Sequence, residues 1–299
     1  MDLPDIKGME DNLRVCLLLK ADDLYFTMAE PHGAALRNDF LGIAVTGLAD
    51  ENLSDSEIAS IDLNRFAIAE RIRALHAMLA DRKLSLDQTH LPDVTYARQD
   101  ALDFVEHFIS TLPNVALGGI DRTQSKNEEV HQLFTLAYAW LNLVETIEGA
   151  FNGETMSALS VTDLALLSGL DTRTLRNHCG PGKHIRTSAT RSVQDRGGAA
   201  PAFVSLHALD TVDWLQNRKS FTISKIDPEW ISKRVAESDP AKTTRGLLIA
   251  GIVNLGALPA LTQSLGITPK QARDWFDDGT PLPEATATAL LRHLLSTTY

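Results

Sequence analysis

Apolar residues recur three or four positions apart along much of the first half of the chain. The pattern runs over residues 58–79, where Asp62 interrupts it, and again over 96–112 and 128–151. Charged residues fall between the apolar ones, and an Asn-Gly pair follows the last segment as a stop signal. This spacing is typical of helices that each bury one face. Residues 1–152 are therefore predicted to form a helical domain.

The first 55 residues carry a weaker pattern. The apolar run 13–19 is too short for its spacing to distinguish a strand from a buried helix, and both remain open. The sequence Ser-Asp-Ser-Glu at 54–57 indicates that a helix begins there.

The most apolar stretch is 246–267. Its length approaches the roughly 20 residues that a membrane-spanning helix needs. Several glycines and the residues Asn254, Pro259 and Gln263 interrupt it, so we expect two short packed helices and no membrane span. The polar residues 220–243, with two Asp-Pro pairs, are expected to connect two C-terminal modules.

Residues 161–178 have the pattern of two short helices joined by a tight turn. Ala165 is small where the helices would touch, and Gly169 permits the positive φ of the turn. Leucines before and after the turn can close the angle between the helices. This is the helix-turn-helix pattern, in which the second helix is available for the major groove of DNA.

The ends of these two helices can also be predicted. Thr162 is a plausible N-cap for the first helix, and Asp171 or Thr172 for the second.

The run Leu164-Ala165 through Gly169-Leu170 to Arg173-Thr174-Leu175-Arg176 resembles the start of the winged helix-turn-helix of MerR and excisionase-like proteins. The resemblance covers residues 155–220 and implies a β-hairpin wing followed by a further helix. Residues 183–187 and 202–206 can form the two strands, with a turn at 196–198. The helix would begin at Ser205 or His207. The wing region, 180–201, is longer than the family's short wing.

A DNA-binding role for this module depends on polar and basic side chains of the second helix and the wing. Arginine, asparagine and threonine can bond to base edges or phosphates, and wing cations can neutralise phosphates. The candidates are Thr172, Arg173, Thr174, Arg176, Asn177, Lys183, Arg186, Arg191 and Arg196.

A second helix-turn-helix pattern occupies residues 258–275. Gly266 lies at its turn, Thr268 can cap the second helix, and Pro269 takes the favoured first position. The segment is similar to the helix-turn-helix of Cro and lambda-repressor-like proteins, with residues 244–256 as first helix and 284–295 as last.

The second module offers weaker DNA contacts. Its candidate contacts are Lys270, Gln271 and Arg273, while the acidic residues at 274, 277 and 278 would repel phosphate. Its fold could instead be retained for packing or dimerisation.

Charge is distributed unevenly along the chain, and the first helix-turn-helix lies in its basic part. The chain carries 28 Lys and Arg against 39 Asp and Glu, a net charge of −11. Residues 1–150 carry −13, residues 151–225 carry +3, and six Lys and Arg against two Asp lie in 171–196. An acidic body with one basic island would favour DNA bound in a single orientation.

Other chemistry has little support. Two cysteines, Cys16 and Cys179, fit a reducing compartment, and residues 1–9 show no secretory signal. His178 and His184 flank Cys179 without the paired spacing of a zinc site, so neither metal nor cofactor is expected. No catalytic motif is present, and no enzymatic activity is expected.

The sequence thus predicts a mainly α protein with three domains. These are an acidic helical domain (1–152), a winged helix-turn-helix with a small β-hairpin (153–225) and a C-terminal helix-turn-helix bundle (226–299). The expected function is sequence-specific binding of double-stranded DNA by a cytoplasmic, bacterial transcriptional regulator acting as a homodimer. The alternative is an antitoxin-like adaptor whose acidic domain binds a basic protein partner.

Overall fold

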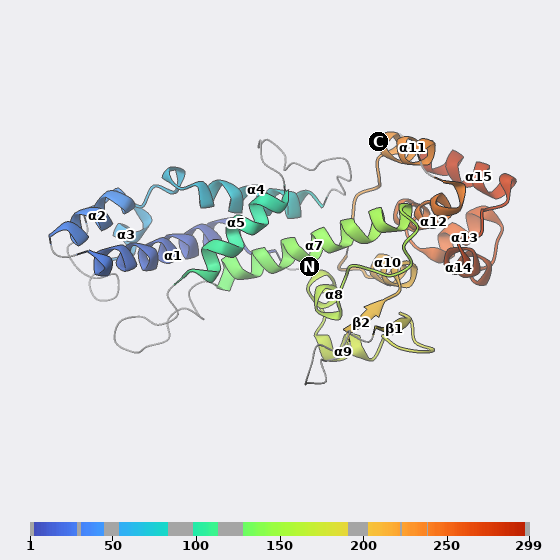
Figure 1. The fold of residues 1–299 in the computed structure, drawn as a ribbon, viewed down its shortest axis with the longest axis horizontal. Coiled ribbons are helices and arrows are strands. Elements are labelled where there is room, and N and C mark those ends of the chain that lie inside the picture. The colour runs from blue at the N-terminus through green and yellow to red at the C-terminus, as the bar shows by residue number, and fades with distance from the viewer. Residues whose placement is uncertain are drawn as a thin grey trace, which may run out of the picture. The chain divides into compact units, whose positions relative to one another are not determined.

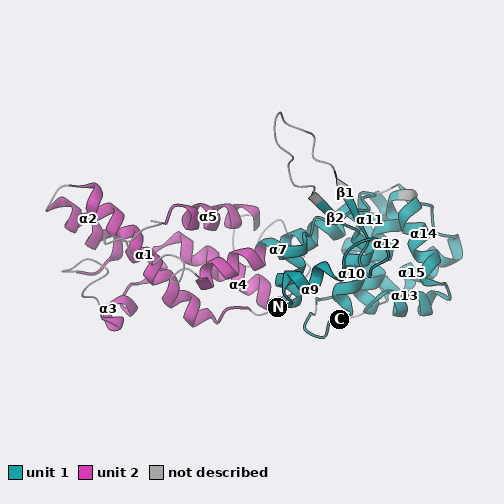
Figure 2. Ribbon diagram, turned by 90° about the horizontal axis from the view of Figure 1, so that it is seen from below, with its two compact units in different colours: residues 1, 81–89, 138–299 teal, residues 2–80, 90–137 magenta. Residues whose placement is uncertain are grey.

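The chain is mainly helical, with one two-stranded antiparallel sheet (Figure 1), and this confirms the expected fold class. The structure, a computed structural model, describes residues 3–28, 31–44, 54–82, 98–112, 128–190, 203–221, 223–237 and 239–296. Two compact units divide the chain (Figure 2). The N-terminal unit comprises residues 2–80 and 90–137, and the C-terminal unit comprises residues 138–299 with residues 1 and 81–89.

The N-terminal unit is built from helices. They are α1 (Ile6–Thr27), α2 (His32–Leu41), α3 (Asp55–Ala59), the 3-10 helix η1 (Leu63–Arg65), α4 (Ala67–Asp81), α5 (Arg98–Ser110) and the first part of α7 (Glu128–Phe151). The undecided run 13–19 lies inside α1 and is helical. The break predicted near Asp62 is confirmed, because the Asp62 side chain accepts a hydrogen bond at the start of η1. Leu13, Leu75 and Leu133 are fully buried in this unit.

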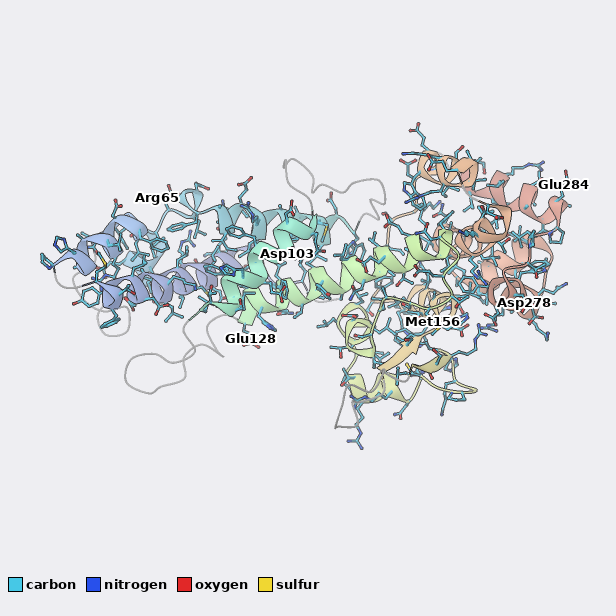
Figure 3. All side chains as sticks on the ribbon, viewed as in Figure 1. Arg65, Asp103, Glu128, Met156, Asp278 and Glu284 are labelled. Carbon is cyan, nitrogen blue, oxygen red and sulfur yellow. The ribbon has the colours of Figure 1, made fainter. Side chains whose placement is uncertain are left out.

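The C-terminal unit holds both helix-turn-helix segments. Its elements after α7 are α8 (Val161–Ser168), α9 (Thr172–Arg176), β1 (Thr187–Thr190), β2 (Phe203–Leu206), α10 (Ala208–Gln216), α11 (Pro228–Glu237), α12 (Pro240–Leu255), α13 (Leu258–Leu265), α14 (Pro269–Asp278) and α15 (Glu284–Leu295). Thr187 pairs with Leu206 and Thr190 with Phe203. Met156, labelled in Figure 3, adds a bridge to His207 beside this hairpin.

Large aromatic side chains lie in the core of this unit among many buried aliphatic ones. The rings of Phe151 and Trp230 meet edge to face at 4.9 Å, and both side chains are buried. Gly246 lets α12 approach closely, because a Cβ at this position would lie 2.3 Å from the Phe151 ring. The core therefore ties the end of α7 to α11 and α12.

Three expectations about element boundaries were wrong. The segment 220–243 is no simple connection, because α11 lies inside it and buries Trp230 and Ile231 beneath a polar outer face. Thr162 does not cap α8; Ser160 does, in a capping box with Asp163. The first strand begins at residue 187 instead of 183, since the residues before it form a loop.

The apolar stretch 246–267 is divided between α12 and α13, as expected. The segments Lys242–Leu255 and Leu258–Leu265 are bent by 105°. Within the described ranges no single helix is long and apolar enough to cross a membrane, although this bent pair passes that test by length and composition.

Candidate nucleic-acid interface

The first helix-turn-helix has the backbone that its sequence predicts. Gly169 ends α8 with φ at +69°. Asp171 is confirmed as the N-cap of α9, because its carboxylate accepts hydrogen bonds from the Thr174 amide (2.8 Å) and hydroxyl (2.6 Å). These hydrogen bonds lower the pKa of the Asp171 carboxyl below its ordinary value. The cap thus fixes the start of a short helix.

The side chains that follow this turn form an exposed basic surface. We define the basic face as Arg173, Arg176 and Lys183; all three are exposed. In the portions of the chain that the structure describes, none of the three forms an ion pair. Asn177 is exposed beside them. Their charges and hydrogen-bond donors are therefore available to an external partner.

The other candidates of the first module differ in availability. The Thr174 hydroxyl donates a hydrogen bond to Asp171 and is therefore occupied. Thr172, the first residue of α9, is half-buried. Arg186 is not part of the basic face, because its guanidinium is paired with Asp210 and Asp277. Arg191 and Arg196 lie outside the described residues.

The second helix-turn-helix repeats this backbone geometry. Gly266 ends α13 with φ at +64°, and Thr268 caps α14 in a capping box with Gln271. Pro269 begins α14, as expected. The two turns are therefore close to equivalent in backbone conformation.

All three candidate DNA contacts of this second module already have intramolecular partners. The Lys270 ammonium lies 2.6 Å from the Asp274 carboxylate. The Arg273 guanidinium lies 3.3 Å from the Asp210 carboxylate on α10. The Gln271 side chain accepts the Thr268 amide hydrogen at 2.9 Å. This module consequently offers no basic surface comparable to that of α9.

Arg186, which precedes β1, is the centre of an ion-pair network. Its Nε lies 2.6 Å from Asp210, and its guanidinium also pairs with Asp277 of α14. Asp210 is only 2% exposed and pairs with Arg273 as well. We call Arg186, His207, Asp210, Arg273 and Asp277 the Arg186 network. It joins the base of the hairpin to α10 and α14.

His207 completes the network as a neutral imidazole. Its Nε2 lies 2.8 Å from Asp277, and its Nδ1 lies 3.1 Å from an Arg186 nitrogen that can only donate. This arrangement requires Nδ1 to accept and Nε2 to donate. Burial, and then the Arg186 charge, lower the pKa of His207 despite the opposing carboxylates.

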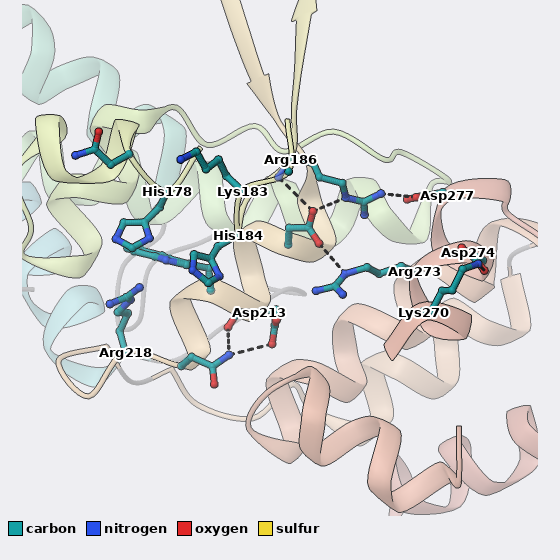
Figure 4. Close-up of a pocket in the computed structure, with 15 residues that line it drawn as sticks. His178, Lys183, His184, Arg186, Asp213, Arg218, Lys270, Arg273, Asp274 and Asp277 are labelled. Atoms are coloured by element: carbon teal, nitrogen blue, oxygen red, sulfur yellow. Dashed lines mark hydrogen bonds and ion pairs between the residues drawn. The ribbon is translucent and has the colours of Figure 1, made fainter. Parts of the chain in front are cut away.

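A cleft of about 910 Å³ lies between the first module and α14 (Figure 4). One wall comes from the residues after α9 and from α10, and the other from α14. The lining residues are Asn177, His178, Gly182, Lys183, His184, Arg186, Asp210, Asp213, Trp214, Asn217, Arg218, Lys270, Arg273, Asp274 and Asp277.

Sequence reasoning missed the residues that give this cleft its character. Trp214 and Arg218 lie four positions apart on and just after α10, and the guanidinium carbon of Arg218 is 3.9 Å from the centre of the Trp214 ring. That spacing was a readable signal. Asp210 gave none, because the arginines that it pairs with, Arg186 and Arg273, lie 24 and 63 positions away in the sequence.

The described residues contain no group of three or more His, Cys, Asp and Glu that could hold a metal ion. The rings of His178 and His184 lie 5.5 Å apart, but Cys179 does not join them in such a group. Comparison of the chain with known protein families, curated proteins and solved structures finds no match.

Proposed function

We propose that this chain is a sequence-specific DNA-binding protein that reads double-stranded DNA with α9 and contacts phosphates with Lys183, in the loop between α9 and β1. One observation carries the proposal. The basic face is exposed and forms no ion pair with the residues that the structure describes, directly after a helix-turn-helix turn, whereas the equivalent side chains of the second module are paired. We propose that the protein acts in the cell as a transcriptional regulator.

The chemistry of the basic face suits this task. Arginine can donate two hydrogen bonds to the edge of guanine, and asparagine can do the same to adenine. Arg173, Arg176 and Asn177 can thus supply base readout, while Lys183 supplies phosphate contact. Because α9 has only five residues, few base pairs fall within its reach.

A small reading surface favours a dimer. Two copies on two half-sites about one helical turn apart would double the contacts. Exposed apolar side chains of the N-terminal unit, Phe26 and Met28 at the end of α1 and Leu36 on α2, offer one candidate interface. We propose a homodimer on this basis.

In this proposal the second module has a structural role, which we call bracing: it holds the first module in place. Its cations are neutralised within the molecule, and Arg273 and Asp277 hold the hairpin base through the Arg186 network. It would therefore position the first module without reading DNA.

The test begins with selection of duplex sites from a random library by the full chain. Affinity for the selected site is then measured by fluorescence anisotropy at several salt concentrations. We expect Arg173→Ala with Arg176→Ala to lose about 1–3 kcal/mol of affinity for each base contact removed. The melting temperature should not change, since both side chains are exposed.

Two matched variants sharpen the result. Lys233→Ala with Arg292→Ala removes the same charge from exposed positions on α11 and α15 and should leave affinity within twofold. Lys270→Ala tests the second module and should have an equally small effect. No selected site, or equal losses for all three variants, would overturn the proposal and favour an adaptor whose acidic N-terminal unit binds a basic protein.

A further inference from the structure

We propose that the cleft between α10, the residues that follow α9, and α14 contains a phosphate-binding site, formed by Lys183, His184 and Arg218 around His178. This site goes beyond the proposed function, because it requires no base readout. It shares Lys183 with the basic face, but His184 and Arg218 line the cleft and Arg173 and Arg176 do not. The phosphate could belong to a small phosphorylated ligand or to the DNA backbone. The chemistry of recognition is the same for both.

A column of neighbouring, mutually tilted rings, with Arg218 at one end, shapes one wall of the cleft. The His184 and His178 rings lie 5.5 Å apart, and the His178 and Trp214 rings 5.8 Å apart. Arg218 covers the Trp214 ring at 3.9 Å. Figure 4 shows His178, His184 and Arg218 gathered on one side of the cleft, opposite Lys270 and Asp274. The column thus places the imidazoles of His178 and His184 and the guanidinium of Arg218 on one wall, where their N–H groups can donate hydrogen bonds to a ligand in the cleft.

The acidic groups of the cleft do not neutralise this wall. Asp210 and Asp277 belong to the Arg186 network, and Asp274 pairs with Lys270. Asp213 accepts hydrogen bonds from the Leu258 amide (2.8 Å) and from Asn217 (3.1 Å). Three of the four carboxylates are therefore paired with cations, and Asp213 is the one carboxylate that is held only by neutral donors, against the two cations Lys183 and Arg218.

The cations on this side of the cleft have no carboxylate partner among the described residues. Neither Lys183 nor Arg218 forms an ion pair with any residue of the described segments, and His184 is exposed. The result is a local excess of positive charge inside a concave site large enough for a small ligand.

The pKa of His178 responds to the positive charges around it. Burial lowers its pKa, and the charges of Arg218, His184 and Lys183 lower it further. Asp213, Lys270 and Arg273 also face the cleft, from α10 and α14. A bound phosphate would offset the repulsion, so it should raise the pKa of His178.

Arginine, lysine and imidazolium are the donors that proteins use for phosphate, since charge-assisted hydrogen bonds are the strong ones. The Asn177 amide adds a neutral donor at the edge of the site. A cavity of about 910 Å³ leaves room for a group larger than the phosphate itself.

The experiment is an NMR titration of the histidine imidazoles of the full chain. The pKa of His178 is measured in inorganic phosphate and in chloride at equal ionic strength. We expect a higher pKa in phosphate and a phosphate affinity that falls about tenfold in His184→Ala with Arg218→Gln, the loss of one charged hydrogen bond or more. Equal pKa values in the two salts would overturn the proposal.

Lys219→Ala is the matched control, because Lys219 is exposed beside Arg218 but does not line the cleft. It should bind phosphate like the natural sequence. If Arg218→Gln perturbs folding, His184→Ala alone is used, and a retained phosphate affinity in that folded variant counts against the site.

A DNA titration of the same variants separates the two sources of phosphate. Loss of DNA affinity with a salt slope reduced by about one per contact identifies the DNA backbone. Unchanged DNA affinity with lost phosphate binding identifies a small phosphorylated ligand. If no DNA is bound but phosphate still raises the pKa of His178, this site stands and only the proposed function fails.

Discussion

The two helix-turn-helix segments share a backbone and differ in what their side chains contact. Both turn at a glycine with φ near +65°, and both begin the second helix at a side-chain cap. After the turn, Arg173 and Arg176 are exposed and form no ion pair within the described ranges. Lys270 and Arg273 lie at comparable places and are paired with Asp274 and Asp210.

The comparison shows that a helix-turn-helix is first a steric solution to a sharp turn between helices. Whether it can bind a polyanion depends on the partners of its cations, because a paired lysine or arginine must give up one carboxylate to reach a phosphate. The cations near each turn that are unpaired within the described residues therefore indicate better than the turn motif or the net charge which module of this chain can bind a polyanion.

The largest expected effect concerns whether the two modules fold together. Phe276 of α14 and Leu175 of α9 are both fully buried. Phe276→Ala should lower the free energy of unfolding by about 3–5 kcal/mol, and Leu175→Ala by about 2–5 kcal/mol. In each variant we expect the C-terminal unit to unfold in a single urea transition, which is monitored by tryptophan fluorescence. Two separate transitions would show that the second module does not brace the first.

The next effect tests the Arg186 network against a surface pair. Asp210→Asn removes a buried carboxylate that serves two arginines and should cost about 2 kcal/mol. Asp274→Asn breaks only the exposed pair with Lys270 and should cost less than about 1 kcal/mol. Chemical denaturation midpoints measure both, and equal costs would contradict the bracing role.

A smaller effect tests the equivalence of the two turns. Gly169→Ala and Gly266→Ala each force a side chain into the left-handed region, at a cost of about 1–2 kcal/mol. Thermal melting should therefore show similar losses. DNA affinity should fall only for Gly169→Ala, because that turn positions α9. A matching fall for Gly266→Ala would give both modules a direct role.

The smallest effect is a pH dependence of the network. The pKa of His207 lies below its ordinary value of 6.5 in the folded chain. The unfolded chain therefore binds a proton more readily, and stability present above pH 6.5 should be lost as the pH falls through that value. His207→Gln should flatten this part of a stability profile measured by denaturation between pH 5 and 8. An unchanged profile would exclude His207 as the cause.

Local sequence signals account for much of the fold. Glycine turns, caps and apolar periodicity depend on neighbours within a few positions, so the bounds of α7 and α15 and the caps Asp171 and Thr268 could be predicted. α11 was missed because its polar outer face dominates the composition of 220–243.

The candidate site was only partly predictable. Arg173 and Arg176 follow from the turn motif. The Arg186 network joins residues from 186 to 277, and no local pattern shows that Asp210 or Asp277 would neutralise arginines so distant in sequence. Arg186 was accordingly predicted as a DNA contact, and its guanidinium is instead bound by two carboxylates.

The apolar pair α12–α13 has a consequence for synthesis of the chain. A nascent polypeptide that exposes this stretch is at risk of aggregation until the stretch is covered. The helices α10 and α11 pack against α12 and precede it in the sequence, whereas α14 and α15 also pack against the pair and follow it. During synthesis α12 can therefore dock on α10 and α11 as it emerges, but the pair is fully covered only after α14 and α15 have been made.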